Sequence, residues 1–170
     1  MFVDARPSVA PGASPPAEPE ALPSLSVCVF TLAEESCAIH LQQVRAVVTI
    51  GALTRVPGAP PTLLGVTNVR GTVVPVVDLR PLLHLGTRSV VGALAVVLED
   101  GDLRAALAVD QVVGLKRFET ALPPSDASRF APVACGALPS SDGMVTLLDG
   151  PTILARVRRA WTPVADPVVT

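Results

Sequence analysis

The sequence LLGVTNVRGTVVPVVDLRPLL, residues 63–83, predicts a β-hairpin that leads into a short helix. Two runs rich in β-branched residues, 65–67 and 72–77, are separated by the segment 68–71, NVRG. Asparagine and glycine favour a tight chain reversal, because glycine adopts positive φ and an asparagine side chain bonds to nearby backbone. Pro75 has no N–H to donate, so we expect the second strand to lie at a sheet edge or to direct this position outward.

A helix is expected directly after this hairpin. Asp78 stands where an N-cap belongs, because its carboxylate can accept the first free backbone N–H groups of a helix. Pro81 falls in the first turn, where its missing donor costs little, and Gly86 can end the helix. The apolar stripe of this helix is expected to consist of Leu79, Leu82, Leu83 and Leu85.

This stretch and its surroundings resemble the CheW-like domain of bacterial chemosensory systems. The main segments that carry the resemblance are, in order, RVPGAPP (55–61), LGV (64–66), NVRG (68–71) and VPVVDLR (74–80). Upstream, FTL (30–32), AI (38–39) and VR (44–45) resemble the first strands of the family. Downstream, DGM (142–144) and LLD (147–149) resemble its last hairpin and the start of the helix that follows. The resemblance covers about residues 26–160.

The resemblance implies a mainly β fold: two SH3-like five-stranded barrels packed side by side, with short helices and a C-terminal amphipathic helix. The residue pattern adds an internal repeat, because the hairpin-like run 30–44 is followed later by a similar run, 96–112, around the turn 99–102. Short strands separated by Gly and Pro turns favour small antiparallel barrels. The repeat alone does not distinguish one barrel from two, whereas the resemblance implies two.

The 170 residues fit one domain with a self-sufficient core. Residues 1–25 contain six prolines among Ala, Ser and Glu without a hydrophobic period, which predicts a disordered Pro/Ala-rich arm. The CheW-like domain with its two barrel lobes is expected over residues 26–163, and a flexible tail over residues 164–170.

Within the domain, alternation over residues 27–32 and 37–41 predicts a hairpin with one buried face and a turn at 34–36. Residues 118–143 are expected to be a loop, because they contain four prolines and several Ser and Asp. Residues 144–148 are expected to form the last strand. A C-terminal helix should follow, capped by Asp149, with an apolar stripe opposite Arg156 and Arg159; the stripe is Ile153, Leu154, Val157 and Trp161.

The composition restricts the function. The net charge is −2, so no global field favours nucleic acid or anionic lipid. The longest apolar or glycine run, residues 90–98, is far shorter than the ~20 residues of a membrane span, and prolines interrupt the first residues where a secretory signal would lie. We therefore expect a cytoplasmic protein without direct membrane insertion. Cys28, Cys37 and Cys135 show no metal or redox spacing and are expected to be buried small hydrophobes.

Catalytic chemistry is not indicated. The two histidines, His40 and His84, lie in no zinc-protease, nucleophile-elbow or phosphate-loop pattern. The acidic segment 99–102 is too short for a calcium-binding EF-hand loop and reads as a solvated hairpin turn. We therefore expect no catalytic residue, metal site or cofactor.

The resemblance implies an adaptor that couples the cytoplasmic hairpin of a chemoreceptor, a methyl-accepting chemotaxis protein, to the regulatory domain of a CheA-type histidine kinase. Other CheW-like proteins are further expected partners. The groove that bears the turn 68–71 would receive the receptor hairpin, since a helix in a groove needs apolar anchors and a few polar groups. The apolar ends of the barrels would pack against the kinase domain.

The resemblance assigns partner-binding roles to Arg70, as the turn arginine, and to Val44, Gly65, Asn68, Val69 and Gly71 around it. From spacing alone, Arg70 would be a solvent-exposed turn residue, Gly65 a glycine needed for close packing, and Val44 a core residue. The sequence has Ala46 where the family often has an acidic residue able to pair with the turn arginine, and it lacks the family's aromatic near Cys37.

Two alternatives to the adaptor stay open, the first of which follows from these departures. One is a divergent CheW-like paralogue that binds a receptor but couples poorly to a kinase. The other is a stand-alone barrel that binds a small ligand, which would require convergent polar and aromatic residues in its interior. The chain has no Tyr and one Trp, which disfavours the ligand barrel, and an enzyme is disfavoured by the missing catalytic patterns.

Overall fold

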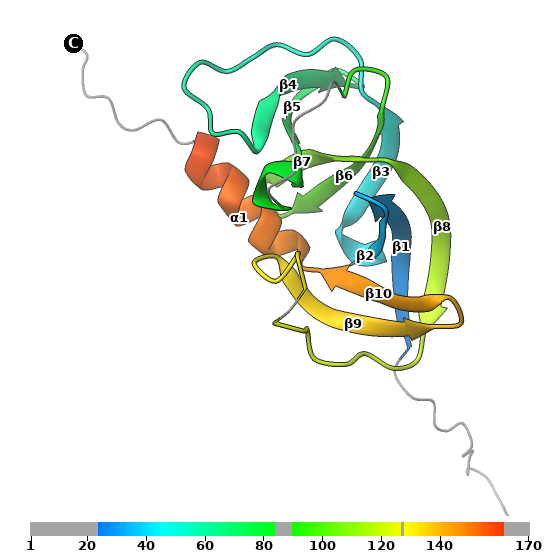
Figure 1. The fold of residues 1–170 in the computed structure, drawn as a ribbon. Coiled ribbons are helices and arrows are strands. Elements are labelled where there is room, and N and C mark those ends of the chain that lie inside the picture. Colours follow the sequence, from blue (N-terminus) through cyan, green and yellow to red (C-terminus); the bar gives the residue numbers. More distant parts are fainter. Residues whose placement is uncertain (1–23, 84–89, 127, 162–170) are drawn as a thin grey trace, which may run out of the picture.

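The computed structural model describes residues 24–83, 90–126 and 128–161 of the chain. Within these residues, ten β-strands form two five-stranded sheets, and an α-helix follows the last strand (Figure 1). The disordered arm expected over residues 1–25 lies almost entirely outside the described residues, and the tail expected over 164–170 lies wholly outside them. Both stay predictions.

The two sheets confirm the expected pair of five-stranded lobes. Lobe A has the strand order β8-β1-β2-β10-β9, and lobe B has the order β3-β6-β7-β5-β4. The strands of lobe A are β1 (Leu25–Leu32), β2 (Glu35–His40), β8 (Gln111–Phe118), β9 (Ala134–Ser140) and β10 (Gly143–Leu148). Those of lobe B are β3 (Val44–Thr49), β4 (Leu63–Val69), β5 (Thr72–Val77), β6 (Leu94–Asp100) and β7 (Leu103–Val109).

The chain crosses between the lobes twice. After the hairpin β1–β2, the 3-10 turn η2 (Leu41–Gln43) leads to β3, which pairs with β6 in lobe B. After the hairpin β6–β7, residue Asp110 leads to β8, which pairs with β1 in lobe A. The repeat found in the sequence therefore corresponds to two equivalent hairpins, each followed by a strand of the other lobe. Lobe B thus begins with β3, before its own repeated hairpin.

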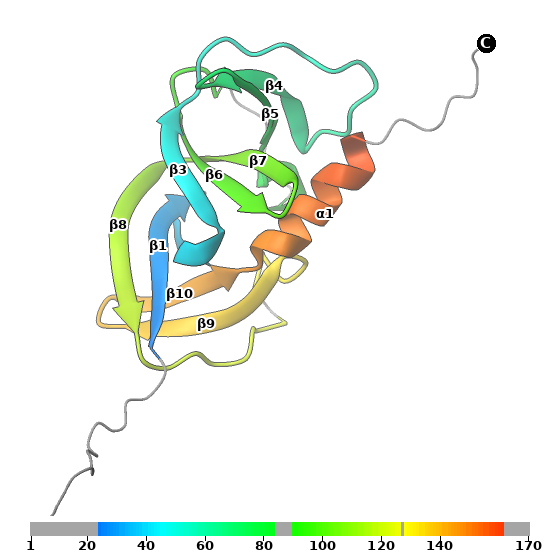
Figure 2. The same ribbon diagram turned by 180° about the vertical axis from the view of Figure 1, so that it is seen from behind.

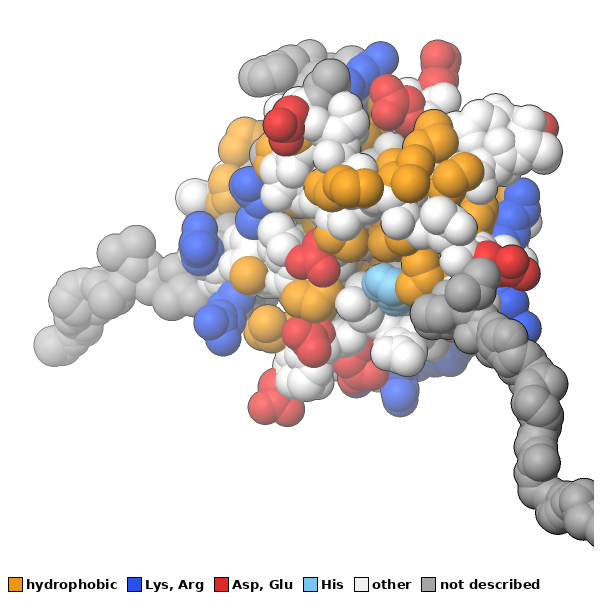
Figure 3. Space-filling model, turned by 90° about the horizontal axis from the view of Figure 1, so that it is seen from below, with side chains coloured by type: hydrophobic (Ala, Val, Ile, Leu, Met, Phe, Trp, Pro, Cys, Tyr) orange, Lys and Arg blue, Asp and Glu red, His pale blue; other side chains and the backbone are white. Residues whose placement is uncertain are grey.

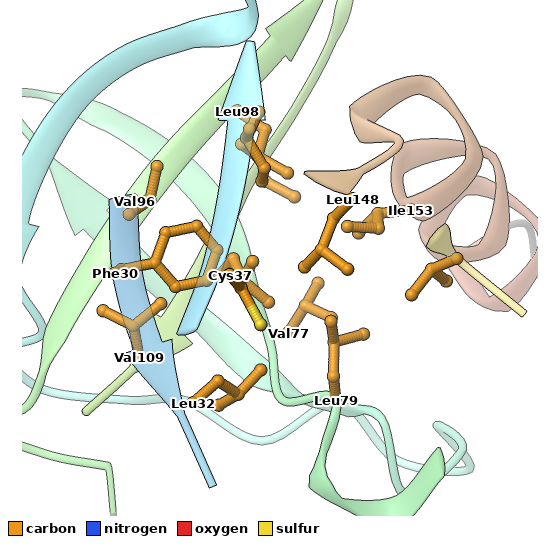
Figure 4. Close-up of a cluster of buried hydrophobic side chains, with 14 of the residues drawn as sticks. Phe30, Leu32, Cys37, Val77, Leu79, Val96, Leu98, Val109, Leu148 and Ile153 are labelled. Atoms are coloured by element: carbon orange, nitrogen blue, oxygen red, sulfur yellow. The ribbon is translucent and has the colours of Figure 1, made fainter. Parts of the chain in front are cut away.

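The two repeated hairpins bury both of their faces. Phe30 and Leu32 of β1 and Val96 and Leu98 of β6 point into a core between the lobes (Figure 4), whereas Val29 belongs to the interior of lobe A. We call this cluster the interlobe core; it includes Phe30, Leu32, Cys37, Ile39, Val77, Leu79, Val96, Leu98, Leu107, Val109, Phe130, Leu148, Ile153 and Leu154. The expectation of one buried face for residues 27–41 was wrong, because the second lobe covers the other face.

The turn of that first hairpin is also displaced from its prediction. It lies at Ala33 and Glu34, whose φ angles are 55° and 68°, and β2 already begins at Glu35. The equivalent turn between β6 and β7 contains Gly101 at φ 63°, as the acidic segment 99–102 predicted. Such left-handed turns match the twist of paired strands and are usually formed by Asn-Gly or Asp-Gly.

The hairpin β4–β5 forms where the sequence predicted it. The side-chain oxygen of Asn68 accepts the Gly71 N–H at 2.8 Å, which closes the turn. Strand β5 is not at an edge, since it lies between β7 and β4. Its parallel pairing with β7 involves only Val76 and Val77, so backbone N–H donors for this pairing are needed only from Val76 onward. Half-buried Pro75, which has no N–H, precedes this segment and is therefore tolerated.

The helix expected after β5 is a 3-10 turn in its described part, η3 (Arg80–Leu83). Asp78 acts as predicted, because its carboxylate accepts the Arg80 N–H at 2.9 Å. Pro81 donates no backbone bond and favours this short form over an α-helix. Leu85 and Gly86 lie outside the described residues.

The C-terminal helix α1 (Gly150–Trp161) lies along one side of the two lobes (Figure 1). The Asp149 carboxylate accepts the Thr152 N–H at 3.3 Å and the Thr152 hydroxyl, which confirms the predicted cap. Ile153, Leu154 and Val157 are buried in the interlobe core, and Arg156 and Arg159 are exposed, as expected. The side chain of Trp161 lies outside the described part.

Two further expectations were wrong. The segment 118–143 contains strand β9, which is an edge strand and therefore accommodates Pro139 opposite Met144. Cys135, on β9, is exposed, whereas Cys28 and Cys37 are buried as expected, and all three are free thiols.

His40 is half-buried and His84 lies outside the described residues. No helix in the described part of the chain is long and apolar enough to cross a membrane.

Candidate partner-binding surfaces

The turn between β4 and β5 presents an arginine to solvent. Arg70 and Gly71 occupy its two central positions with φ angles of 51° and 88°, and both residues are exposed. The bond from the Gly71 N–H to Asn68 holds this conformation. No ion pair joins Arg70 to another described residue, and Ala46 of β3 offers it no carboxylate. The guanidinium is therefore available to a partner.

The other predicted site residues have different surroundings. Val69 and Ala46 both pack against the interior of lobe B, Val69 from β4 and Ala46 from β3. Val44 is half-buried at the start of β3, where it pairs with Leu98 and packs against the interlobe core. Val44 thus marks the junction of the lobes, whereas Val69 packs on the interior of lobe B from β4, the strand at the other end of the sheet order from β3.

Gly65 is buried, and its backbone is approached by a neighbouring segment. A Cβ built there would lie 2.4 Å from the Thr54 carbonyl oxygen, and φ is 152°. Thr54 forms two backbone hydrogen bonds with Val66, of 2.9 and 2.8 Å. Only glycine permits this approach, so Gly65 supports the hairpin from inside and presents no side of itself to a partner.

Sequence reasoning missed an apolar strip on strand β8. Val113 and Leu115 are 52% and 67% exposed, and Val47 of β3 is 41% exposed. Strands β3 and β8 are the two crossover strands, and both lie on the side of the molecule opposite α1 (Figures 1 and 2). Large exposed aliphatic side chains on neighbouring strands mark interaction surfaces. The alternation of apolar residues in the sequence did not reveal which of them face solvent.

A second pair of exposed apolar residues lies at equivalent positions of the two lobes. Val73 is the second residue of β5 and Met144 the second residue of β10, and the two strands have the same burial pattern. They are 63% and 53% exposed. Figure 3 views the molecule from the lobe A end and shows hydrophobic side chains gathered over part of that face. Each barrel therefore has an exposed apolar residue beside a hairpin tip, Val73 at β4–β5 and Met144 at β9–β10.

Charged groups flank strand β3. Arg45 lies 3.5 Å from Glu99, and Arg104 bonds the other oxygen of Glu99 at 2.6 Å. This hydrogen bond from Arg104, with the charges of both arginines, holds the pKa of Glu99 below its ordinary value. Three or more His, Cys, Asp or Glu side chains placed to hold a metal ion do not occur together among the described residues.

Comparisons with known proteins agree on one family. A model of the CheW-like domain matches residues 26–158. The chain is 44% identical over 57 residues to a Chemotaxis protein CheW of Bacillus subtilis (strain 168), over 34% of this chain and 36% of that protein. It is 25% identical over 140 residues to the Chemotaxis protein CheW of Thermotoga maritima, over 81% of this chain and 93% of that protein.

A solved structure supports the same assignment. The crystal structure of scaffolding protein TtCheW from Thermoanaerobacter tengcongensis superposes with a TM-score of 0.66 and 26% identity, over 74% of this chain and 88% of that chain. The matched segment spans only about a third of the Bacillus relative, 36% of its length, whereas the family model covers both lobes. The chain therefore belongs to the CheW-like domain family.

Proposed function

We propose that this protein is a scaffold that couples the cytoplasmic tips of chemoreceptors to a CheA-type histidine kinase in a chemosensory signalling array. The observation that carries the proposal is the match of the CheW-like family model over residues 26–158, which spans both lobes. As a member of this scaffold family, the chain is not an enzyme. A cytoplasmic location is part of the same proposal, as are other CheW-like proteins as further partners.

The receptor surface is proposed to combine the turn 68–71 with the exposed residues of the two crossover strands β3 and β8. It consists of the turn 68–71 with Arg70, Val44 and Val47 of β3, and Val113 and Leu115 of β8. A receptor hairpin of amphipathic helices would place aliphatic side chains against the β8 strip and carboxylate or carbonyl oxygens near Arg70. Gly65 would act indirectly, by holding the hairpin that carries the turn.

The kinase surface is proposed to be the apolar end of a barrel. Val73 and Met144, beside the tips of β4–β5 and β9–β10, are the exposed anchors at the two ends. The resemblance to the CheW-like family implies that the regulatory domain of the kinase shares this fold, so equivalent ends are proposed to pack lobe against lobe. Such docking buries apolar area that solvent now contacts.

Titration of the full chain against a receptor cytoplasmic fragment and, separately, a kinase regulatory domain tests the proposal. Leu115→Glu should weaken the receptor complex about tenfold or more and leave the kinase complex near its wild-type affinity. Met144→Glu, in lobe A, should weaken the kinase complex about tenfold or more and leave the receptor complex near its wild-type affinity. Failure of the wild-type chain to bind either partner would refute the proposed function.

A second candidate function is a CheW-like paralogue that binds a receptor but couples poorly to a kinase. The observation that favours it is Ala46, which leaves Arg70 without the acidic neighbour that the family often has. Receptor binding with no measurable kinase binding in the same titrations would select it. The small-ligand barrel has less support, because valine and alanine side chains fill the interior of lobe B.

A further inference from the structure

A buried cluster of charges lies where the two lobes meet. Arg80 follows β5 and is only 6% exposed, and its guanidinium lies 3.5 Å from the fully buried Asp78. The same guanidinium pairs with the carboxylate of Asp110, the residue that joins β7 to β8. One oxygen of Asp78 has no hydrogen-bond partner among the described residues, which leaves Arg80 as its main source of compensating charge.

Asp110 also holds the first hairpin of lobe A. Its second carboxylate oxygen accepts the Ala33 N–H at 2.8 Å, and its own N–H donates to the Thr31 carbonyl oxygen at 2.9 Å. Ala33 and Glu34 have positive φ without being glycine, so this turn depends on support from outside itself. The set of Arg80, Asp78, Asp110 and the Ala33 N–H, called the Arg80 cluster, therefore connects both lobes.

The cluster lies at the start of β8 and at the end of β5. Asp110 directly precedes β8, the strand that carries Val113 and Leu115. Asp78 and Arg80 directly follow β5, at the end of the hairpin β4–β5 that is opposite the turn with Arg70. The interlobe core is mostly aliphatic, and aliphatic contact alone is not directional. Charge-assisted hydrogen bonds have fixed directions and lengths, so they can set the angle at which the lobes meet.

We propose that Arg80 and Asp110 are positioning residues that fix the orientation of lobe A relative to lobe B, and thereby the spacing of β3 and β8 in the receptor surface. The part that concerns the receptor rests on the proposed function, whereas the part that concerns the lobes does not. Neither residue needs to touch the receptor. Receptor binding should then respond to a change in the Arg80 cluster more than kinase binding does, because the receptor surface uses strands of both lobes.

The test compares Asp110→Asn, which keeps the shape of the side chain and removes its charge, with Glu99→Gln as matched control. Glu99 pairs with Arg104 and Arg45, and all three lie on strands of lobe B. Distances between spin labels on Thr49→Cys and Arg117→Cys, one exposed residue in each lobe, are measured by pulsed electron paramagnetic resonance in a Cys135→Ser background. Burial raises the pKa of the Cys28 and Cys37 thiols and keeps them unlabelled.

Asp110→Asn should shift or broaden the distance distribution and weaken receptor-fragment binding about fivefold or more, with kinase binding changed less than about twofold. Glu99→Gln should leave the distance distribution unchanged. Arg80→Lys, which keeps the charge but loses the planar fork, should give an intermediate result. An unchanged distance distribution in Asp110→Asn would overturn the proposal, as would equal losses for both partners. If the wild-type chain binds no receptor fragment, the proposed function fails, and the distance distribution alone still decides the role of the cluster in orienting the lobes.

Discussion

Arg70 illustrates how a backbone conformation selects the direction of a functional side chain. Its φ of 51° lies in the left-handed region, which costs an ordinary residue about 1–2 kcal/mol relative to its preferred conformations. The hydrogen bond between Asn68 and the Gly71 N–H compensates for part of this cost. The turn therefore holds an exposed guanidinium in a defined place on a rigid hairpin.

Reversal of this charge should separate binding from folding. We expect Arg70→Glu to change the free energy of unfolding by less than about 0.5 kcal/mol, because the side chain is exposed and forms no ion pair with another described residue. Binding to a receptor fragment should weaken by about 2–5 kcal/mol if the contact is desolvated. Titration and a melting curve for each variant measure the two effects. Equal receptor affinity in both proteins would remove Arg70 from the surface, and a collapsed melting curve would make it structural.

Gly65 and Gly136 provide a matched pair for a packing prediction, because they occupy equivalent positions of the two lobes. A Cβ at Gly65 would lie 2.4 Å from the Thr54 carbonyl oxygen, whereas one at Gly136 would lie 3.2 Å from that of Leu122. Gly65→Ala should therefore lower the free energy of unfolding by about 2 kcal/mol or more. Gly136→Ala should cost less than about 1 kcal/mol. Chemical denaturation measures both, and equal costs would contradict the close approach at Gly65.

Among the elements, α1 joins the two lobes through a single amphipathic face. Ile153, Leu154 and Val157 enter the interlobe core, and Asp149 at the end of β10 caps the first turn. The helix packs on both lobes through this apolar face, and its N-terminal cap stabilises the turn that carries Ile153 and Leu154. Loss of the cap should therefore lower the free energy of unfolding of the whole domain.

We expect Asp149→Ala to lower the free energy of unfolding by about 1 kcal/mol, the usual contribution of an N-cap. In a chain of this size that corresponds to a melting temperature lower by about 3 °C. Asp142→Ala, in the exposed turn before β10, is the control and should change the melting temperature by much less. If both variants melt alike, the hydrogen bonds of Asp149 to Thr152 contribute nothing measurable.

At the scale of the whole molecule, the arm preceding β1 is predicted to be dispensable for folding. Deletion of residues 1–23 should leave the melting temperature within about 2 °C, because a segment without an apolar period buries too little area to stabilise the domain. Calorimetry of the shortened and full chains measures the difference. A drop of many degrees would show that the arm packs on a lobe.

The sequence predicted those parts of the fold that depend on local chemistry. The turn at Asn68 and Gly71, strand β10 and the cap at Asp149 all follow from residue types with one strong local preference. Strand β9 was missed because its small residues and Pro139 have weak strand propensity, and its pairing with β10 decides its conformation.

Features that depend on the second lobe could not be predicted. The burial of both faces of β1 and β2, and the solvent exposure of Val113 and Leu115, depend on how the lobes pack. The same is true of the candidate partner-binding surface, of which the sequence predicted only the part that depends on local chemistry. Arg70, Asn68 and Gly71 were recognised from the turn, whereas the apolar strip on β8 lies more than forty residues away in the chain.

The double crossover of the chain also has a consequence for the order of assembly. Lobe B is one continuous segment, residues 44–109, whereas lobe A is divided between residues 25–40 and 111–148. During synthesis on the ribosome, the strands of lobe B can therefore pair before the second part of lobe A exists. Closing lobe A joins segments about seventy residues apart, and such non-local pairing carries a loop-closure entropy and slows folding. Until that step, the outward faces of β1, β2, β6 and β7 would be exposed aliphatic surface, which makes the nascent half-molecule a substrate for chaperones.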